Sequence, residues 1–282
     1  MKKIIGYMFL LGSMNSMAEV VKDRIHSVVN VPGSQVKLVK FENGRVAYLE
    51  GNTKDLAGEV NKFKRRPVVA ELDKNSRLMA FYPITDLKNQ SELMETEENP
   101  PLFEPTVVEN MKELKLLFDD FNSDYKRRSE CSDRAHVWAW EMFKQKGIKS
   151  EKVYALFTAT WIIKTRLKWW FHVAPLVSVK TPQGVEKMVM DFMFNDRPLS
   201  IKAWTDNMVF DLRACKMTKK FSEYDVNPQT EACYMMIDNM YYRLPGDLHA
   251  QELQGRYRQS WNASEIRTSY RLGFKQVKEV EL

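Results

Sequence analysis

The chain has 282 residues, of which 44% are hydrophobic and 28% are charged, and its formal net charge is +6. This composition is that of an ordinary globular protein and excludes an intrinsically disordered chain. So small a net charge gives no reason to expect nucleic acid as a partner, and the length allows one large domain or two smaller ones.

Residues 1–18 have the pattern of a secretion signal peptide. Lys2 and Lys3 form a basic start, Ile4 to Leu11 is an apolar run, and Ser16-Met17-Ala18 fits a small-x-small cleavage site. The apolar run is too short to span a bilayer, and no other run in the sequence is long enough. We therefore expect a mature protein that is secreted or periplasmic and has no membrane partner.

Residues 19–85 are predicted to form a small α+β domain. Two strand-like runs, 36–41 and 46–49, flank Asn43-Gly44, which is a hairpin signal. A helix is expected over about 54–64, and a second hairpin over 68–82. Nothing in this unit has a catalytic pattern, and its one histidine, His26, is expected at the surface.

Residues 86–105 are predicted to be a linker between two domains. The segment is acidic and contains Pro100, Pro101 and Pro105, which break regular structure and leave the chain open to proteases. The second domain is expected to span 106–282. Thr106 and Glu109 fit a capping box, which predicts that a helix begins at Thr106.

The second domain is predicted to combine a helix with an antiparallel sheet. The helix runs from Cys131 to Gly147, a glycine at the position where helices often end. Strands are expected over 153–157, 171–180 and 186–191, with 161–168 as a basic, aromatic connection. Beyond about residue 200 the signals weaken: Tyr241 to Pro245 is strand-like, and the chain after 250 is expected to be helical or mobile.

Cys131 is the candidate nucleophile. It shares one apolar helix face with Ala135, Trp138 and Met142, so the thiol should point towards the sheet. It also stands in the first turn of the helix, where free N–H groups and the helix dipole favour an anion. These groups would favour a thiolate and steady a developing oxyanion.

His172 and Asp191 are the candidate partners of this thiol. Thr181-Pro182-Gln183-Gly184 suits a type I turn, and pairing of 181 with 184 places Asp191 opposite Ala174, as a diagonal neighbour of His172. A one-residue slip would separate them, but the turn chemistry argues against it. Cysteine, histidine and aspartate in this arrangement are typical of nucleophilic acyl chemistry.

The other histidines are less suited to act as the base. His136 follows Cys131 by five residues on the same helix, about 140° around its axis, and therefore points away from the thiol. His249 lies in a poorly defined tail.

Three cysteines are an odd number for an exported protein, in which disulfides can form. Cys215 and Cys233 could close a short loop, and Cys131 would then stay free. The alternative, in which all three are reduced and buried, remains open.

Three segments in order resemble the secreted bacterial protein-glutaminases: Cys131-x-x-Arg134-Ala135-His136, then Trp170-Phe171-His172-Val173-Ala174, then an aspartate, Asp191, that ends the next strand. The resemblance implies a papain- and transglutaminase-like α+β fold and a Cys131–His172–Asp191 triad. It also implies that residues 19–85 are a pro-region that covers the active site until it is cleaved. The chain departs from the family in having fewer cysteines and a longer charged C-terminal tail.

On this basis we expect a hydrolase that deamidates protein-bound glutamine to glutamate and releases ammonia through a thioester intermediate. Its partner would be a protein substrate with an exposed glutamine, held by Trp169, Trp170 and Phe171. We expect a monomer that needs no metal and no organic cofactor. A transglutaminase or a cysteine peptidase could use the same triad, and a non-catalytic exported binding protein is a further alternative.

Overall fold

The computed structural model describes residues 19–31, 34–50, 60–83, 103–208, 215–225, 232–255 and 257–282. The predicted signal peptide at 1–18 and most of the predicted linker at 86–105 lie outside these residues. Of the helix expected over 54–64, residues 60–64 are described: 60–62 are helical, but 63 lies in a turn and 64 in a β-bridge, so the helix ends earlier than predicted. No helix in the described part of the chain is both long and apolar enough to cross a membrane.

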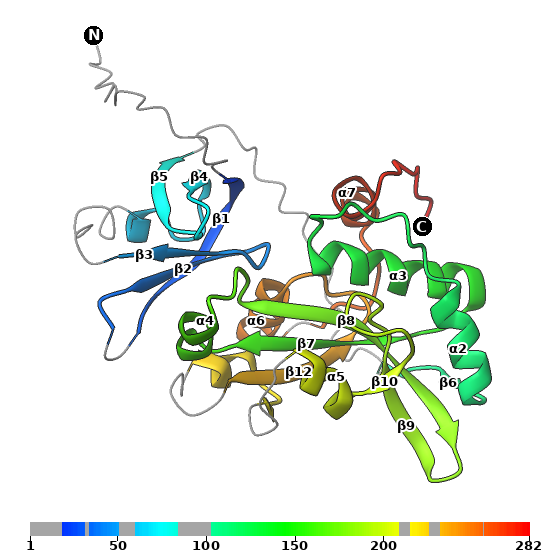
Figure 1. Ribbon diagram of the computed structural model, residues 1–282. Coiled ribbons are helices and arrows are strands. Elements are labelled where there is room, and N and C mark those ends of the chain that lie inside the picture. Colours follow the sequence, from blue (N-terminus) through cyan, green and yellow to red (C-terminus); the bar gives the residue numbers. More distant parts are fainter. Residues whose placement is uncertain are drawn as a thin grey trace.

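The N-terminal unit is a five-stranded antiparallel sheet in the order β3-β2-β1-β4-β5 (Figure 1). The long strand β1 (Glu19–Asn30) joins its two halves, because its first half pairs with β4 and its second half with β2. Both predicted hairpins are confirmed: they are β2 (Lys37–Phe41) with β3 (Val46–Leu49), and β4 (Pro67–Leu72) with β5 (Leu78–Pro83).

The C-terminal unit is built on a larger sheet in the order β10-β9-β8-β7-β12-β11. Its centre is antiparallel and consists of β7 (Glu151–Phe157), β8 (Phe171–Thr181), β9 (Gly184–Val189) and β12 (Cys233–Asn239). Three short strands complete it: β6 (Val107–Val108), β10 (Leu199–Ser200) and β11 (Cys215–Met217). This sheet confirms the predicted α+β class.

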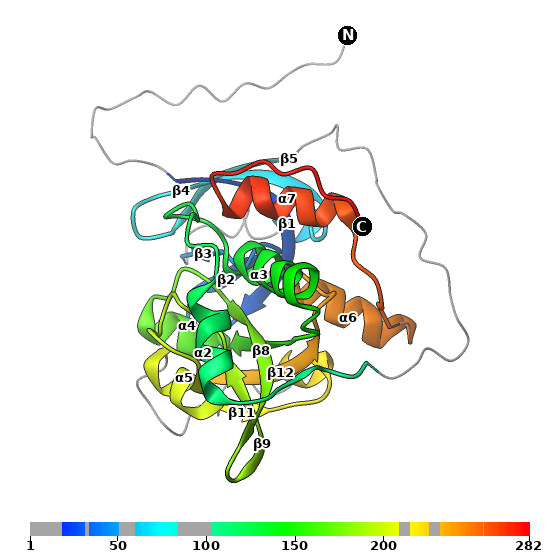
Figure 2. The same ribbon diagram turned by 90° about the vertical axis from the view of Figure 1, so that its right-hand side faces the viewer.

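Helix α3 (Cys131–Lys146) begins and ends where the sequence predicted, and Gly147 closes it with a φ of 68°. The helix lies over β8, and α7 (Ala263–Gly273) covers its opposite side (Figure 2). Ala135 therefore packs into the core of the sheet, whereas Trp138 packs into a second cluster that includes residues of α7. The helix is therefore covered on both sides, and its packing contacts are not confined to one apolar face.

Three local predictions are wrong. Residues 107–108 form β6, and α2 (Met111–Asp119) begins only after Asn110, whose side chain caps it. The Thr106 hydroxyl is occupied elsewhere, since it accepts a hydrogen bond from the Lys149 N–H at 3.0 Å. The connection at 161–168 contains the end of a helix, α4 (Ala159–Thr165).

The third error concerns the segment after β12. Tyr241 to Pro245 is not a strand, because β12 ends at Asn239 and Pro245 opens α6 (Pro245–Gln254). Proline suits the first turn of a helix, where no N–H is needed. The remaining described helices are α5 (Ile201–Met208) and a 3-10 turn at Phe221–Asp225.

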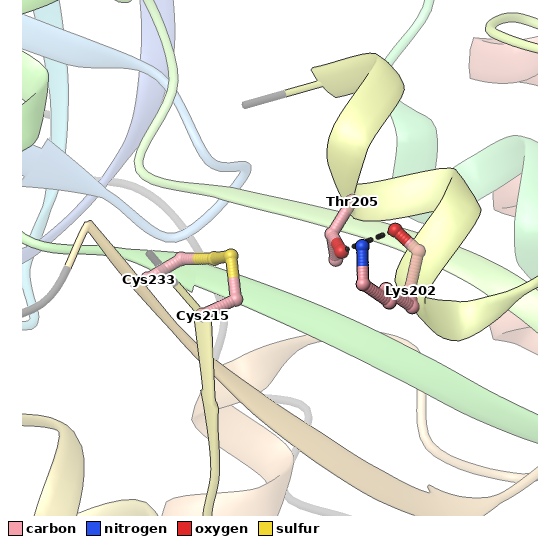
Figure 3. Close-up of a disulfide and its surroundings, with 4 residues drawn as sticks. All are labelled: Lys202, Thr205, Cys215 and Cys233. Carbon is pink, nitrogen blue, oxygen red and sulfur yellow. Dashed lines mark hydrogen bonds between the residues drawn. A yellow bond between two sulfur atoms is a disulfide. The ribbon is translucent and has the colours of Figure 1, made fainter. Parts of the chain in front are cut away.

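The structure joins Cys215 and Cys233 in a disulfide, across the parallel pair β11 and β12 and close to Lys202 and Thr205 of α5 (Figure 3). Cys131 is the free cysteine. The arrangement with three reduced thiols is therefore not the one that the structure shows.

The two units pack against each other through the β2–β3 hairpin. The Val46 N–H donates to the Lys168 carbonyl at 3.0 Å, and the Trp170 N–H donates to the Gly44 carbonyl at 2.7 Å. Tyr48 of β3 belongs to the same apolar cluster as the buried residues of β7 and β8. The N-terminal unit is thus docked on the loop that leads into β8.

His26 takes part in this contact, so the expectation that it lies at the surface is wrong. Its ring stacks on Trp170 with 4.6 Å between the ring centres and meets the edge of Phe221 at 6.0 Å. The partners are more than 140 residues away along the chain, and local sequence carries no sign of them.

Candidate active site

Cys131 is placed by the way α3 begins. Glu130 has an extended backbone, with φ −75° and ψ 144°, and the helix starts at the next residue. The thiol is partly exposed, and its Sγ lies 4.0 Å from the carbonyl oxygen of Phe171. The first turn of α3 therefore meets the first residues of β8, where His172 stands.

The β8–β9 hairpin brings Asp191 to His172. Thr181 pairs with Gly184, and this register continues to Leu176 and Val189, as the turn predicted. Asp191 lies two residues beyond the end of β9 rather than inside the strand. It still reaches His172, whose Nε2 is 2.6 Å from Asp191 Oδ2.

The His172 ring is held between the carboxylate and the thiol. Because Nε2 pairs with Asp191, Nδ1 is the ring nitrogen left for Cys131, which lines the same cavity as His172. Burial alone would lower the pKa of His172, but the charges of Asp191 and Cys131 outweigh it and raise the pKa to about 9. At neutral pH the ring is therefore an imidazolium, the partner that a thiolate requires.

The carboxylate of Asp191 is fully buried and well supplied with donors. Oδ2 accepts from His172 and from the Trp204 indole Nε1 at 2.8 Å, while Oδ1 accepts from the Met193 N–H at 3.2 Å. Burial alone would raise the pKa of Asp191, but the charge of His172 and these hydrogen bonds lower it. The group therefore stays ionised next to the imidazolium.

Residues 106–208 match a family model described as Glutaminase. The matched segment contains Cys131, His172 and Asp191. The family match thus covers the part of the chain that carries all three candidate residues.

Solved structures with the same fold support the wider architecture. The crystal structure of pro-protein-glutaminase is 15% identical over 89% of this chain and 92% of that chain, with a TM-score of 0.53. A mutant of pro-protein-glutaminase is 15% identical over 90% of this chain and 94% of that chain, also with a TM-score of 0.53. At this identity the likeness shows a shared fold, which spans both units. No curated protein matches the chain significantly.

A cavity of about 970 Å³ opens beside the Cys131 thiol. Trp169 and Phe171, two residues of the predicted aromatic wall, line it together with Cys131 and His172. Trp170 does not line it, because neighbouring residues of an extended chain point to opposite sides. Its buried indole instead donates to the Phe41 carbonyl of the N-terminal unit at 2.6 Å.

The turn between β2 and β3 lies in the same cavity. Asn43 and Arg45 are among its lining residues, and Arg45 Nε is 3.1 Å from Glu130 Oε1, next to Cys131. Gly44 has a φ of 99°, and a Cβ at this position would approach the Phe171 ring to 2.8 Å. Only glycine allows the turn to come so close to this wall of the cavity.

The remaining histidines are not part of the site. His136 is fully buried, and its Nδ1 is 2.7 Å from Lys152 Nζ, so it points away from Cys131 as predicted. His249 lies in α6 and stacks on Phe221. Among the described residues, no three His, Cys, Asp or Glu side chains are grouped closely enough to hold a metal ion.

Trp204 is a contact of the candidate site that the sequence did not reveal. It is fully buried in α5 and donates to the carboxylate that orients His172. A tryptophan on an amphipathic helix is ordinarily a core residue, so only its contact with Asp191 distinguishes it.

Proposed function

We propose that the chain is a protein-glutaminase, a hydrolase that converts protein-bound glutamine to glutamate and releases ammonia. The observation that carries this proposal is the alignment of Cys131, His172 and Asp191 inside the segment that matches the family model described as Glutaminase. The partner would be a protein with an exposed glutamine. We further propose that the protein acts as a secreted or periplasmic monomer.

The first half of the reaction would form a thioester. The Cys131 thiolate attacks the carbon of the glutamine side-chain carboxamide, and the N–H groups at the start of α3 stabilise the oxyanion that develops. His172 then gives its proton to the leaving nitrogen, the C–N bond breaks, and ammonia departs. Asp191 keeps the imidazole oriented and stabilises its charged form throughout.

The second half would restore the enzyme. The now neutral His172 takes a proton from a water molecule, which attacks the thioester carbon. The C–S bond breaks, the glutamate side chain is released, and the Cys131 thiolate and the imidazolium form again. The walls formed by Trp169 and Phe171 suit the aliphatic part of the glutamine side chain.

We also propose that residues 19–85 act as a pro-region. Their β2–β3 turn lies over the cavity beside Cys131, and Gly44 packs against Phe171. Cleavage in the predicted linker at 86–105 and departure of this unit would open the site to a protein substrate. Activity should therefore rise after limited proteolysis.

The test is ammonia release from a glutamine-containing protein before and after limited proteolysis. Cys131→Ala should abolish ammonia release while the thermal unfolding curve stays close to that of the wild type. Retained ammonia release in this variant would overturn the assignment.

The same incubation separates the alternatives. New crosslinks between lysine and glutamine would identify a transglutaminase, and new N-termini would identify a cysteine peptidase. A non-catalytic binding protein would give none of these products. Its Cys131 would also react with iodoacetamide at pH 6 no faster than an ordinary thiol.

A further inference from the structure

The C-terminal unit's share of the cavity wall carries mostly positive charge. Four cationic side chains belong to it, against one carboxylate, that of Glu130. The four cations are Arg127, Arg128, Arg134 and Lys168. They flank the triad thiol, so their field acts at the place where a substrate glutamine must enter.

Three of these cations are free to meet a ligand. Arg127, Arg128 and Lys168 are exposed, and none of them forms an ion pair with another described residue. They come from two separate segments, the turn before α3 and the loop before β8. We call these three residues the cationic rim.

Arg134 has a different role, because it stabilises the turn that precedes its own helix. Its guanidinium is buried and donates to the carbonyl and the hydroxyl oxygen of Ser129. This contact fixes the turn that carries Arg127 and Arg128 against the first turns of α3. The rim is thus attached to the helix that carries the nucleophile.

Glu130 is the one opposing charge. Burial raises the pKa of its carboxyl, while Arg45 and Arg134 act in the opposite direction. Arg45 belongs to the N-terminal unit and would leave with it, but Arg134 remains beside Glu130. One partly compensated carboxylate does not cancel three free cations.

We propose that the cationic rim makes this enzyme select glutamines whose neighbours in the substrate are acidic. This inference rests on the proposed function and specifies its substrate class. Complementary charge raises the rate of encounter and suppresses wrong partners, and its effect weakens as salt screens it. Exposed ion pairs are individually weak, so the three together should change kcat/KM by about tenfold.

The test uses three peptides that share a central glutamine and carry glutamate, serine or lysine on both sides of it. Ammonia release is measured with the full chain, in whichever form, intact or proteolysed, is active on a protein substrate. The glutamate peptide should exceed the lysine peptide about tenfold in kcat/KM. In about 1 M NaCl, where the Debye length is about 3 Å, the ratio should approach one.

Two double variants provide a matched comparison, since each removes two positive charges. Arg127→Gln with Arg128→Gln should lower the preference for the glutamate peptide by about fivefold, through KM. Lys144→Gln with Lys146→Gln, on exposed positions at the far end of α3, should leave the preference unchanged. Thermal unfolding of both variants shows that each is folded before its kinetics are compared.

Equal kcat/KM values for the three peptides at low salt would overturn the inference while leaving the deamidase proposal intact. A preference for the lysine peptide would also overturn it and would assign the selection to Glu130. Absence of ammonia from every peptide and from the protein substrate would instead overturn the proposed function, and the rim inference with it.

Discussion

Two histidines, one in the candidate triad and one at the contact between the units, show how neighbouring charges add to or oppose the effect of burial on a pKa. His172 lies beside Asp191 and Cys131, and its pKa is raised to about 9 despite its burial. His26 is also desolvated, but its charged neighbours are cationic, and its pKa is lowered to about 3. The first ring is therefore charged at neutral pH and the second is neutral.

The surroundings of His26 explain the direction of its shift. Burial contributes most, and the charges of Lys40 on β2, His249 on α6, and Lys64 and Arg65 before β4 act in the same direction. Its ring stacks on Trp170 and meets the edge of Phe221. The surroundings of His172 thus favour the protonated ring, and those of His26 favour the neutral ring.

The largest expected effect comes from removing the carboxylate that raises the pKa of His172. Asp191→Asn keeps the shape of the side chain but removes its charge, so the pKa of His172 should fall from about 9. Ammonia release should drop by about 10³-fold, since the imidazolium and its orientation both depend on Asp191. The rate of ammonia release and an NMR titration of the His172 ring measure the two effects.

The same variant has a stability signature with a defined sign. A histidine whose pKa is raised on folding contributes its full stabilisation at pH values below its pKa in the unfolded chain, near 6.5. This contribution is lost as the pH rises through the pKa in the folded protein, about 9. The wild type should lose stability over this window relative to Asp191→Asn. Parallel stability curves from pH 6 to 9.5 would contradict the charge argument.

A smaller effect is expected at Trp204, which donates to the same carboxylate oxygen as His172. Trp204→Phe keeps most of the buried ring but removes the N–H, and a hydrogen bond to a charged group contributes about 2 kcal/mol. We expect kcat to fall about 30-fold. The acid limb of the pH–rate profile should move to higher pH, because Asp191 loses a donor that lowers its pKa.

Trp138→Phe is the matched control for this change. Its indole is also buried and donates to a carbonyl, that of Asn122 at 2.9 Å, but it lies outside the triad. This variant should lose comparable stability without a shift in the pH profile. If both variants lower kcat alike and neither shifts the profile, Trp204 has only a structural role.

The difference between the two regions also explains which features the sequence could predict. The candidate triad depends on a helix start and a tight turn, and both signals lie within a few residues of the groups that they place. The contact between the units depends on pairs such as Lys40 with Tyr224, which are 184 residues apart and 2.6 Å from each other. No local pattern encodes such a pair, and for the same reason the sequence does not reveal the contacts of His26 and Trp170 between the units.

The next prediction concerns the stability that the protein loses in acid because of His26. Because the pKa of His26 is lowered on folding, its contribution to the free energy of unfolding is complete above about pH 6.5 and is lost as the pH falls towards 3. Glu42 opposes this trend, since burial raises its pKa to about 7 and protonation then favours the folded state. The prediction is therefore made for the difference between the wild type and His26→Phe, which keeps the stacking on Trp170 but cannot be protonated.

Between pH 7 and pH 5 the wild type should lose about 1–2 kcal/mol of unfolding free energy relative to His26→Phe, the lower figure allowing for the partial exposure of the ring. Urea denaturation at the two pH values measures this. A constant difference would show that the His26 ring titrates freely in the folded protein.

The smallest effect is expected at Arg45, whose guanidinium pairs with Glu130 at 3.1 Å and with Glu19 at 3.2 Å. Both pairs are partly exposed, so Arg45→Gln should weaken the docking of the β2–β3 turn by only about 0.6 kcal/mol. Iodoacetamide should then label Cys131 in the uncleaved chain about threefold faster. Arg77→Gln is the control, because Arg77 pairs with Asp73 and Glu50 inside the N-terminal unit. If both variants label at the wild-type rate, the apolar contacts of Gly44 and Tyr48, rather than ion pairs, hold the turn over the thiol.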